Sequence, residues 1–394
     1  MNLNVYRSIT ALCGAHLAVD FLLGVLPAYT NLAALDASRV GLLLGIAIFL
    51  GESLQILFGY LGDKGFERMF APLGILFAST VFFLPYTSGD IALFAVILST
   101  YLGSALFHPS GASLATGASK LGKGALTTLF ITAGTLGAAF SQSGFTWAYT
   151  SLQGKTAFLY IPAALFAVAL FAITSGMATQ KQKRTGAIWT HAKAIAPLFG
   201  IQAIIQMVLI SFMFLLPNVL EIRHFPKWFV LGGANFFFVI GAFSFGLKSA
   251  FFVDKVCSRK HLFSLLIGGG LIFYFFLLLS NAGLIVASTL LFSVGGLLGS
   301  VIPVALAAGQ RQVPPESQSL IAGTLLGGAA CLGGGGLVLA SSLMRLFAAH
   351  QAENALLLIG SLLTLALVFV IFLEKKNSQT FLTTKSLLPH HRSS

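Results

Sequence analysis

Long apolar runs separated by short polar breaks dominate this sequence. Splitting the chain at its charged or Pro/Gly/Ser-rich breaks leaves twelve such runs. They cover residues 8–30, 40–62, 70–88, 90–115, 123–149, 156–178, 193–220, 229–253, 261–281, 283–309, 318–346 and 353–373. A hydrocarbon core of roughly 30 Å needs about 20 apolar residues per helix. The pattern therefore predicts an all-α membrane protein with twelve transmembrane helices.

The composition indicates a membrane protein and argues against nucleic acid as a partner. The 394 residues are 57% hydrophobic and 9% charged, with 37 Phe, and the mean hydropathy is +0.91. These values exclude a soluble domain of this length. The net charge of +12 comes from Lys and Arg spread through short loops, whereas nucleic-acid binding gathers such residues in one patch. We therefore expect the lipid bilayer as a partner and no nucleic acid.

The positions of the basic residues predict the orientation of the chain. With the N-terminus inside, seventeen Lys and Arg lie in cytoplasmic connections, one lies within a span, and five lie on the opposite side. Those five are Arg39, Lys155, Arg223, Lys227 and Arg345. Cytoplasmic loops of membrane proteins carry an excess of Lys and Arg, so both termini are predicted to be cytoplasmic.

The chain divides at a polar, basic stretch after the sixth apolar run. Residues 179–192 predict a cytoplasmic linker between an N-terminal six-helix bundle at 1–178 and a C-terminal one at 193–373. The last polar segment, 374–394, predicts a cytoplasmic tail.

Landmarks of the first half recur in the second half at offsets of 190 to 194 residues. The pairs are Asp63 and Asp254, Arg68 and Arg259, Pro27 and Pro217, Pro109 and Pro303, and TLGAA at 135–139 with LGGAA at 326–330. Two parallel six-helix repeats about an axis along the membrane normal are an architecture of secondary transporters. The four prolines are candidate hinges, and we expect Pro109 to break its helix.

Ionisable residues in the apolar runs are the candidate chemistry. His16 and Asp20 lie one helical turn apart on the same face. Asp20, Glu52 and His108 each lie about eleven or twelve residues from the cytoplasmic end of their run, which at roughly 1.5 Å per residue is mid-membrane. A charge there costs roughly 2.5 to 3.5 kcal/mol or more, so such residues mark an ion or substrate path. The alternative is a neutral histidine that hydrogen-bonds a neighbouring helix.

A short motif follows the second run. Gly59 allows close helix approach, and Asp63 can pair with a basic residue such as Arg68. The segment GYLGDKGFER at 59–68 resembles the loop signature of the major facilitator superfamily. We expect Gly59, Asp63 and Arg68, with Asp254 and Arg259 in the second half, to form a cytoplasmic latch; the alternative is a simple loop with a solvated ion pair.

Further segments resemble the fosmidomycin-resistance branch of that superfamily. They are HLAVDFLLGVLP at 16–27, ALFHPSG at 105–111, LFITAGTLGAA at 129–139 and the run at 310–333. The resemblance implies a proton-driven exporter of a drug or metabolite in the inner membrane. Its His-x-x-x-Asp and Phe-His-Pro motifs fall here on His16, Asp20 and Phe107 to Pro109.

The two halves differ in polarity at matching positions. Aligning the prolines puts Ile210 opposite Asp20 and Ile302 opposite His108. Proton coupling is therefore predicted to lie in the first half, where His16, Asp20, Glu52 and His108 would titrate as a coupled set.

Neutral polar and aromatic residues are the candidates for the substrate cavity. They are Gln55, Phe107, Gln202, Gln206 and Asn235. The alternative for each amide is a hydrogen bond to a neighbouring helix.

The expected function is a proton-coupled antiporter that exports a small organic molecule. A proton-coupled importer, a uniporter and an intramembrane enzyme are the alternatives. The sequence lacks HExxH and other catalytic motifs, so we expect no enzyme, no cofactor and no metal. The chain is expected to act as a monomer.

Overall fold

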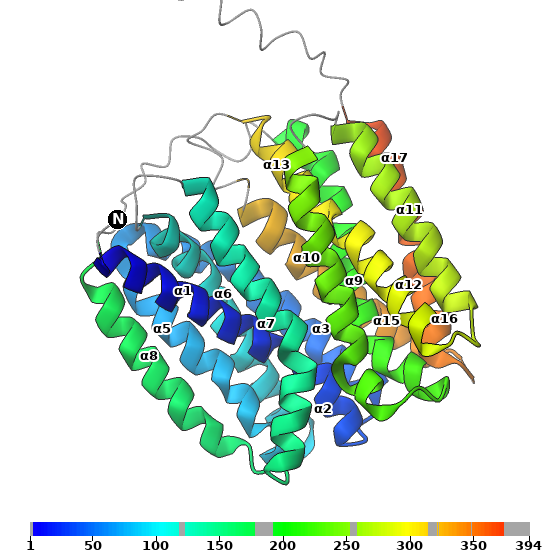
Figure 1. Cartoon of the computed structure of the whole chain (residues 1–394), viewed down its shortest axis with the longest axis horizontal. Coiled ribbons are helices and arrows are strands. Elements are labelled where there is room, and N and C mark those ends of the chain that lie inside the picture. The colour runs from blue at the N-terminus through cyan, green and yellow to red at the C-terminus, as the bar shows by residue number, and fades with distance from the viewer. Residues whose placement is uncertain are drawn as a thin grey trace, which may run out of the picture.

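The computed structural model describes residues 3–117, 123–177, 192–252, 258–313, 321, 323–347 and 349–373. These residues form helices joined by short turns, with no strand among them. The helices run roughly along one direction of the molecule (Figure 1). The linker and tail predicted at 179–192 and 374–394 lie almost wholly outside the described residues.

The first set of helices comes from the N-terminal part of the chain. It consists of α1 (Leu3–Leu23), α2 (Leu26–Leu32), α3 (Ala37–Ser53), α4 (Gln55–Leu61), η1 (Gly62–Phe66), α5 (Glu67–Ala78), η2 (Ser79–Tyr86), α6 (Gly89–Gly117), α7 (Lys123–Ser151), η3 (Ala157–Leu159) and α8 (Tyr160–Ser175). Within it α1 packs on α7, and α5 packs on α6.

The second set follows in the same way. It consists of α9 (Ala192–Ile222), η5 (Phe229–Gly233), α10 (Ala234–Phe252), α11 (Ser258–Leu278), α12 (Leu284–Gly299), α13 (Val301–Gln310), η7 (Thr324–Gly328), α15 (Ala329–Met344), α16 (Gln351–Gly360) and α17 (Leu362–Ile371). Here α10 packs on α12, and α9 packs on α15.

Consecutive helices join into spans long enough to cross a bilayer. In the described part of the chain, 11 spans are both long and apolar enough to do so. The remaining long helix, α7, has 29 residues, and the side chains of its first six, 123–128, lie outside the described part of the chain. The helical membrane fold predicted from the apolar runs is confirmed.

Two of the four prolines lie beside breaks, and two lie inside continuous helices. Pro27 lies in the first turn of α2, which begins at Leu26 after the gap that follows α1, and Pro303 lies just after the break between α12 and α13. Pro217 lies within α9. Pro109 lies within α6, which runs unbroken from Gly89 to Gly117. The expected break at Pro109 is therefore wrong: proline removes one backbone hydrogen bond, and the packing of α6 against α5 and α3 holds the helix together.

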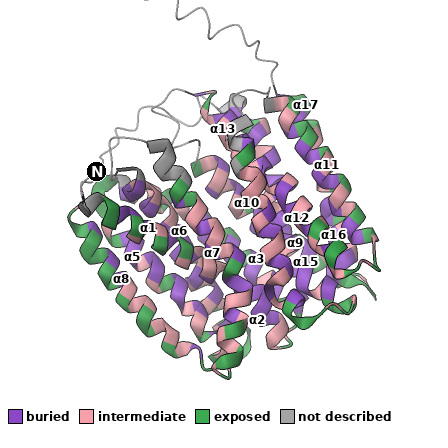
Figure 2. Cartoon of the chain, viewed as in Figure 1, coloured by how far each residue is buried: buried purple, intermediate pink, exposed green. Residues whose placement is uncertain are grey.

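The spans define two ends of the molecule. We call the end with the connections at 33–36, 87–88, 152–156, 223–228, 279–283 and 345–347 the distal end. The opposite end, where α1 begins and α17 ends, is the proximal end. Exposed residues cover the outer helices (Figure 2), above all α8. Only 17% of the most apolar window of the α8 span is buried inside the molecule, so most of this helix is available to lipid.

Hydrogen bonds join the two sets of helices near the distal end. The Ser38 hydroxyl donates to the Ser341 carbonyl at 2.8 Å, and Arg345 Nε donates to the Ser38 oxygen at 2.9 Å. The Thr146 hydroxyl donates to the Leu231 carbonyl at 2.9 Å. Helices α3 and α15, and helices α7 and η5, are thereby held together at this end.

Glycines let α3 and α15 approach backbone to backbone. A Cβ on Gly45 would lie 2.7 Å from the carbonyl oxygen of Gly334, and a Cβ on Gly334 would lie 2.5 Å from the carbonyl oxygen of Gly45. Small residues at such crossings are typical of close helix packing in membranes. In the same glycine-rich run, a Cβ on Gly335 would meet nothing within 4 Å.

A buried ion pair fixes the distal end of the second set. Arg223 Nε donates to Glu353 at 2.6 Å, and its other nitrogens donate to the carbonyls of Phe276 and Leu277 at 2.9 and 2.6 Å. These carbonyls end α11, where no backbone donor follows within the helix. The Arg223 side chain is 3% exposed. Arg223 therefore ties three helices together.

We expect Arg223→Met to lower the melting temperature of the purified protein substantially. Removing one partner of a buried ion pair costs about 3–5 kcal/mol. Because Glu353 would keep its contact with His350 at 2.7 Å, we expect a destabilisation near the lower value. The matched control is Arg39→Met, because Arg39 pairs with Asp90 on the exposed distal surface and such pairs contribute about 0–1 kcal/mol. Equal melting temperatures of the two variants in detergent would contradict this account.

Candidate functional site

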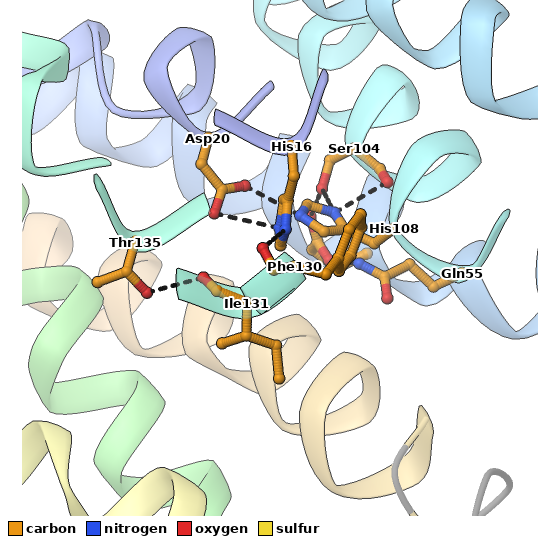
Figure 3. Close-up of polar contacts among 9 residues, drawn as sticks. His16, Asp20, Gln55, Ser104, His108, Phe130, Ile131 and Thr135 are labelled. Carbon is orange, nitrogen blue, oxygen red and sulfur yellow. Dashed lines mark hydrogen bonds and ion pairs between the residues drawn. The ribbon is translucent and has the colours of Figure 1, made fainter. Parts of the chain in front are cut away.

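Asp20 contacts two histidines inside the first set of helices (Figure 3). His16 Nε2, one turn earlier on α1, is 3.4 Å from Asp20 Oδ2. His108 Nε2, on α6, is 3.0 Å from Asp20 Oδ1. The predicted trio is thus brought together, and each carboxylate oxygen faces one ring nitrogen.

The remaining ring nitrogens fix the histidine tautomers. His16 Nδ1 lies 2.7 Å from the carbonyl oxygen of Phe130 on α7, and His108 Nδ1 lies 3.1 Å from the carbonyl oxygen of Ser104. A carbonyl only accepts, so each Nδ1 carries the proton in these bonds. In a neutral ring Nε2 then presents a lone pair to Asp20. A hydrogen bond to Asp20 therefore requires a further proton, on the carboxyl group or on the ring.

The polar cluster continues from α6 to the break between α3 and α4. The Ser104 hydroxyl lies 3.0 Å from His108 Nδ1 and donates to Glu52 Oε1 at 2.7 Å. Gln55 Nε2 donates to the other oxygen of Glu52. Asp20, His108, Ser104, Glu52 and Gln55 form one hydrogen-bonded chain across three spans. Glu52 is buried, whereas the side chains of Asp20 and His108 are 21% and 24% exposed.

Aromatic rings cover the other face of His16. Its ring stacks on Phe130 at a centroid distance of 4.1 Å and lies 5.8 Å from the ring of Phe107. Phe107 is fully buried, and a Cβ on Gly74 would lie 2.6 Å from its Cβ. Phe107 therefore packs behind the cluster in this conformation, which differs from the cavity-lining position predicted for it.

Helix α7 approaches the cluster through a glycine. A Cβ on Gly134 would lie 2.4 Å from Asp20 Oδ2 and 2.5 Å from His16 Nε2. The next small residue along the same face, Gly137, is in contact with the backbone of Leu17. Gly134 therefore leaves the space that the carboxylate and the imidazole occupy between α1 and α7.

We expect Gly134→Ala to disturb the cluster itself. The added methyl group overlaps Asp20 and His16, and overpacking of this kind costs about 1–3 kcal/mol. Asp20 would have to turn away from at least one histidine, so any pH-dependent signal from the cluster should change. The control is Gly335→Ala, where the methyl group meets nothing within 4 Å. Carboxyl bands in infrared difference spectra taken at two pH values would measure the change; unchanged bands in Gly134→Ala would contradict it.

The remaining cavity candidates occupy different places. Gln202 is fully buried, and its amide donates to the Ile302 carbonyl at 3.2 Å. Asn235 is buried, and its amide donates across the two sets to Ala138 at 3.0 Å. Gln206 is half-buried. The alternative stated for the amides, a bond to a neighbouring helix, describes Gln202 and Asn235 in this conformation.

Two carbonyl oxygens of these amides are available for other donors. The Oε1 atom of Gln202 and the Oδ1 atom of Asn235 are buried without a hydrogen-bond partner in the described part of the chain. A role of these two residues in substrate binding stays a prediction.

The latch residues are only partly described. Gly59 is close to α6, since a Cβ there would lie 3.5 Å from Pro109. Arg68 is half-buried, and its Nε atom has no hydrogen-bond partner among the described residues; Arg259 is half-buried at the start of α11. The side chain of Asp63 and the whole of Asp254 lie outside the described residues. The latch stays a prediction.

A metal ion would have one candidate position among the described residues. The donor atoms of His16, Asp20 and His108 lie within 4.8 Å of one another. The contacts of Asp20 with His16 and His108 given above already account for their closeness. The expected absence of a metal and a cofactor stays a prediction.

Ser104 and Gly134 were missed by the sequence analysis. Ser104 precedes His108 by four residues, so the helical spacing that links His16 to Asp20 also links this pair and could have identified it. The carbonyl of Phe130 carries no sequence signal, because every residue has one.

Comparison with solved structures establishes the fold. A bacterial homolog of the human lysosomal transporter Spinster matches with a TM-score of 0.76 in its inward-facing, unoccupied conformation and 0.77 in its inward-facing, occupied one, at 13% identity and with 94% of this chain and 97% of that chain covered. A mutant of the nucleoside transporter NupG matches with a TM-score of 0.73, 15% identity, and coverage of 95% and 100%. The chain has the major facilitator fold.

These similarities establish the fold but do not test the resemblance to the fosmidomycin-resistance branch. Neither the family models nor the curated proteins compared with the chain gave a match. The Spinster homolog and NupG are named as transporters, which supports the expectation that this chain is not an enzyme. The fosmidomycin-resistance branch stays a prediction.

Proposed function

We propose that this chain is a secondary active transporter that exports a small organic molecule in exchange for protons by alternating access. One observation carries the proposal: Asp20 is held between His16 and His108 in the middle of a major facilitator fold. An intramembrane carboxylate paired with histidines marks a proton or substrate path. The matched structures are transporters in name, which supports the same class of function.

Alternating access would arise from relative motion of two six-helix bundles, 1–178 and 193–373. The bonds among Ser38, Ser341 and Arg345 hold the distal end together, so we infer that access to the partly exposed side chains of Asp20 and His108 is from the proximal end. The excess of basic residues assigns the proximal end to the cytoplasm, and the inner membrane follows from the fosmidomycin-resistance resemblance. Such a state would exchange protons and substrate with the cytoplasm, as an inward-facing transporter does.

The proton would act by changing which bonds Asp20 can make. A carboxylate accepts from both histidines when they are charged, and a carboxyl group can donate to only one ring nitrogen. Binding and release of a proton therefore change the connection between α1 and α6. A substrate bound between the bundles would compete with one of these protonation states, which couples the two fluxes.

Proton flux in liposomes tests the proposal. Purified protein is reconstituted with a pH-sensitive dye inside, and fosmidomycin or uridine is added outside under an imposed pH gradient. Fosmidomycin is chosen from the family resemblance, and uridine from the NupG likeness. We expect at least one probe to move protons in the opposite sense to its own transport, and protein-free liposomes to show no exchange.

The other outcomes each decide between alternatives. Probe and proton moving in the same sense would make the chain an importer, and probe movement without protons would make it a uniporter; both overturn antiport. A defined panel of organic cations, anions and nucleosides with no flux for any member would overturn the transporter assignment for those classes.

A further inference from the structure

The hydrogen-bonded chain ends at an irregular crossing of the two sets of helices. Helix α3 ends at Ser53 and α4 begins at Gln55, so Glu52 and Gln55 flank a break in this span. Opposite lies η7, a π-helical turn at Thr324–Gly328. A Cβ on Gly327 would lie 2.9 Å from the amide oxygen of Gln55. Single π turns in helices occur often at functional sites.

Ser104 is the only described side chain that bridges His108 and Glu52. Its hydroxyl is 3.0 Å from His108 Nδ1 and 2.7 Å from Glu52 Oε1, and Ser104 is 1% exposed. A hydroxyl both accepts and donates. It can therefore take a proton from the ring and pass its own proton to the carboxylate.

We propose that Glu52 is a second proton site, which receives its proton from His108 through Ser104. We further propose that protonation of Glu52 changes the contact between Gln55 and η7, so that this contact depends on the protonation of the Asp20 cluster. This inference rests on the proposed proton-coupled transport. It adds a path and a positioning residue that the three-residue cluster does not contain.

The proposed step balances in protons and charge. An imidazolium at His108 loses its Nδ1 proton to Ser104 Oγ, while the hydroxyl proton of Ser104 moves to Glu52 Oε1. One N–H bond and one O–H bond break, and two O–H bonds form. His108 becomes neutral with its remaining proton on Nε2, which donates to Asp20, and its Nδ1 hydrogen bond to the Ser104 carbonyl is lost. Glu52 becomes a carboxylic acid, and Ser104 regains its hydroxyl after rotating.

The surroundings of Glu52 contain few other groups that can hold a proton. His108 and Tyr101 of α6 and Asp20 of α1 interact with its charge, as does Cys331 of α15 across the interface. Cys331 donates to the Phe49 carbonyl at 3.3 Å. Among these groups, only His108 is joined to Glu52 by hydrogen bonds through a described side chain.

Protonation of Glu52 would change the contact at the crossing. The carboxylate accepts from Ser104 and Gln55, and a carboxylic acid has a proton of its own to donate. Either the Ser104 hydroxyl or the Gln55 amide must then reorient. Because Gln55 lies at the break beside Gly327, its reorientation acts where the two sets of helices meet.

Infrared difference spectroscopy after a rapid pH drop tests the path in the purified full chain. We expect two carboxyl bands, one lost in Asp20→Asn and the other lost in Glu52→Gln. In Ser104→Ala the Glu52 band should rise about 100-fold more slowly, the lower end of what a positioned proton-transfer group contributes. Ser104→Thr keeps the hydroxyl and should restore the rate; Ser104→Cys replaces Ser104→Ala if the latter does not fold.

Ser110 supplies a matched control on the same helix. It is also 1% exposed, and its hydroxyl has no hydrogen-bond partner in the described part of the chain. Ser110→Ala should leave both bands and both rates unchanged. Equal rates in Ser104→Ala and Ser110→Ala, or no Glu52 band, would overturn the inference while the Asp20 band upholds the proposed function. Loss of both bands from the wild type would overturn both.

A distance measurement tests the mechanical part. Spin labels at Ser88 and Ser280, exposed positions at the distal end of the two sets, should report a pH-dependent separation in the wild type and in Ser110→Ala. We expect this response to disappear in Glu52→Gln and to be delayed in Ser104→Ala to the same extent as the Glu52 band. A retained response in Glu52→Gln, or an undelayed one in Ser104→Ala, would show that the crossing does not depend on Glu52.

Discussion

Asp20→Asn is expected to reduce proton-coupled transport to the level of protein-free liposomes while the protein remains folded. The amide has the shape of the carboxylate but cannot hold a proton for exchange. Its nitrogen can still donate to one histidine, which limits the cost of the buried change. The measurement is the dye assay with whichever probe the wild type transports, together with size-exclusion chromatography of the variant.

Asp90→Asn is the matched control for this change. Asp90 is an exposed carboxylate at the distal end that pairs with Arg39, so the same chemical change is made outside the membrane interior. We expect wild-type flux from this variant. Wild-type proton flux in Asp20→Asn would remove Asp20 from the mechanism, and histidine alone would then have to carry the proton.

Gly45→Leu is expected to open the distal end. The new side chain would overlap the Gly334 carbonyl and Val338, both 2.7 Å from the position of its Cβ. Overpacking of about 1–3 kcal/mol corresponds to a shift of roughly 5- to 150-fold between two conformations. The variant should therefore favour a state in which α3 and α15 are separated, and transport should fall because the closed state is rare.

The Ser88 and Ser280 labels measure this shift directly, with the native cysteines replaced. We expect a longer distance in Gly45→Leu than in the parent protein. Gly335→Leu is the control, since no atom lies within 4 Å of its Cβ position, and it should keep the parent distance. The same distance in Gly45→Leu and Gly335→Leu would contradict closure by backbone contact at this crossing.

The helical membrane fold follows from the sequence because lipid leaves few alternatives. An apolar run of sufficient length must satisfy its backbone internally, and a helix does so. The breaks at Pro27 and Pro303 are local proline effects that a sequence can indicate. The continuity of α6 through Pro109 is not local, because the packing of neighbouring helices decides whether one missing hydrogen bond bends the chain.

The candidate site was predictable where it depends on rare residue types. His16, Asp20, Glu52 and His108 are conspicuous in apolar runs, and the structure brings all four into one hydrogen-bonded group. The supporting contacts were not predictable. Every residue has a backbone carbonyl and the chain has many glycines, so the sequence does not show which carbonyl accepts from His16 or which glycine lies against Asp20. Phe107 shows the converse: beside the cluster in sequence, it is turned into the core.

The contact between α1 and α7 has a consequence for how the chain assembles in the bilayer. Gly134 lies against Asp20 and His16, and Gly137 lies against the backbone of Leu17. Until α7 is in place, the two ionisable side chains of α1 would lack this cover, and ionisable groups are costly in lipid. Substitutions that loosen the contact between α1 and α7 would therefore appear first as poor biogenesis of the protein.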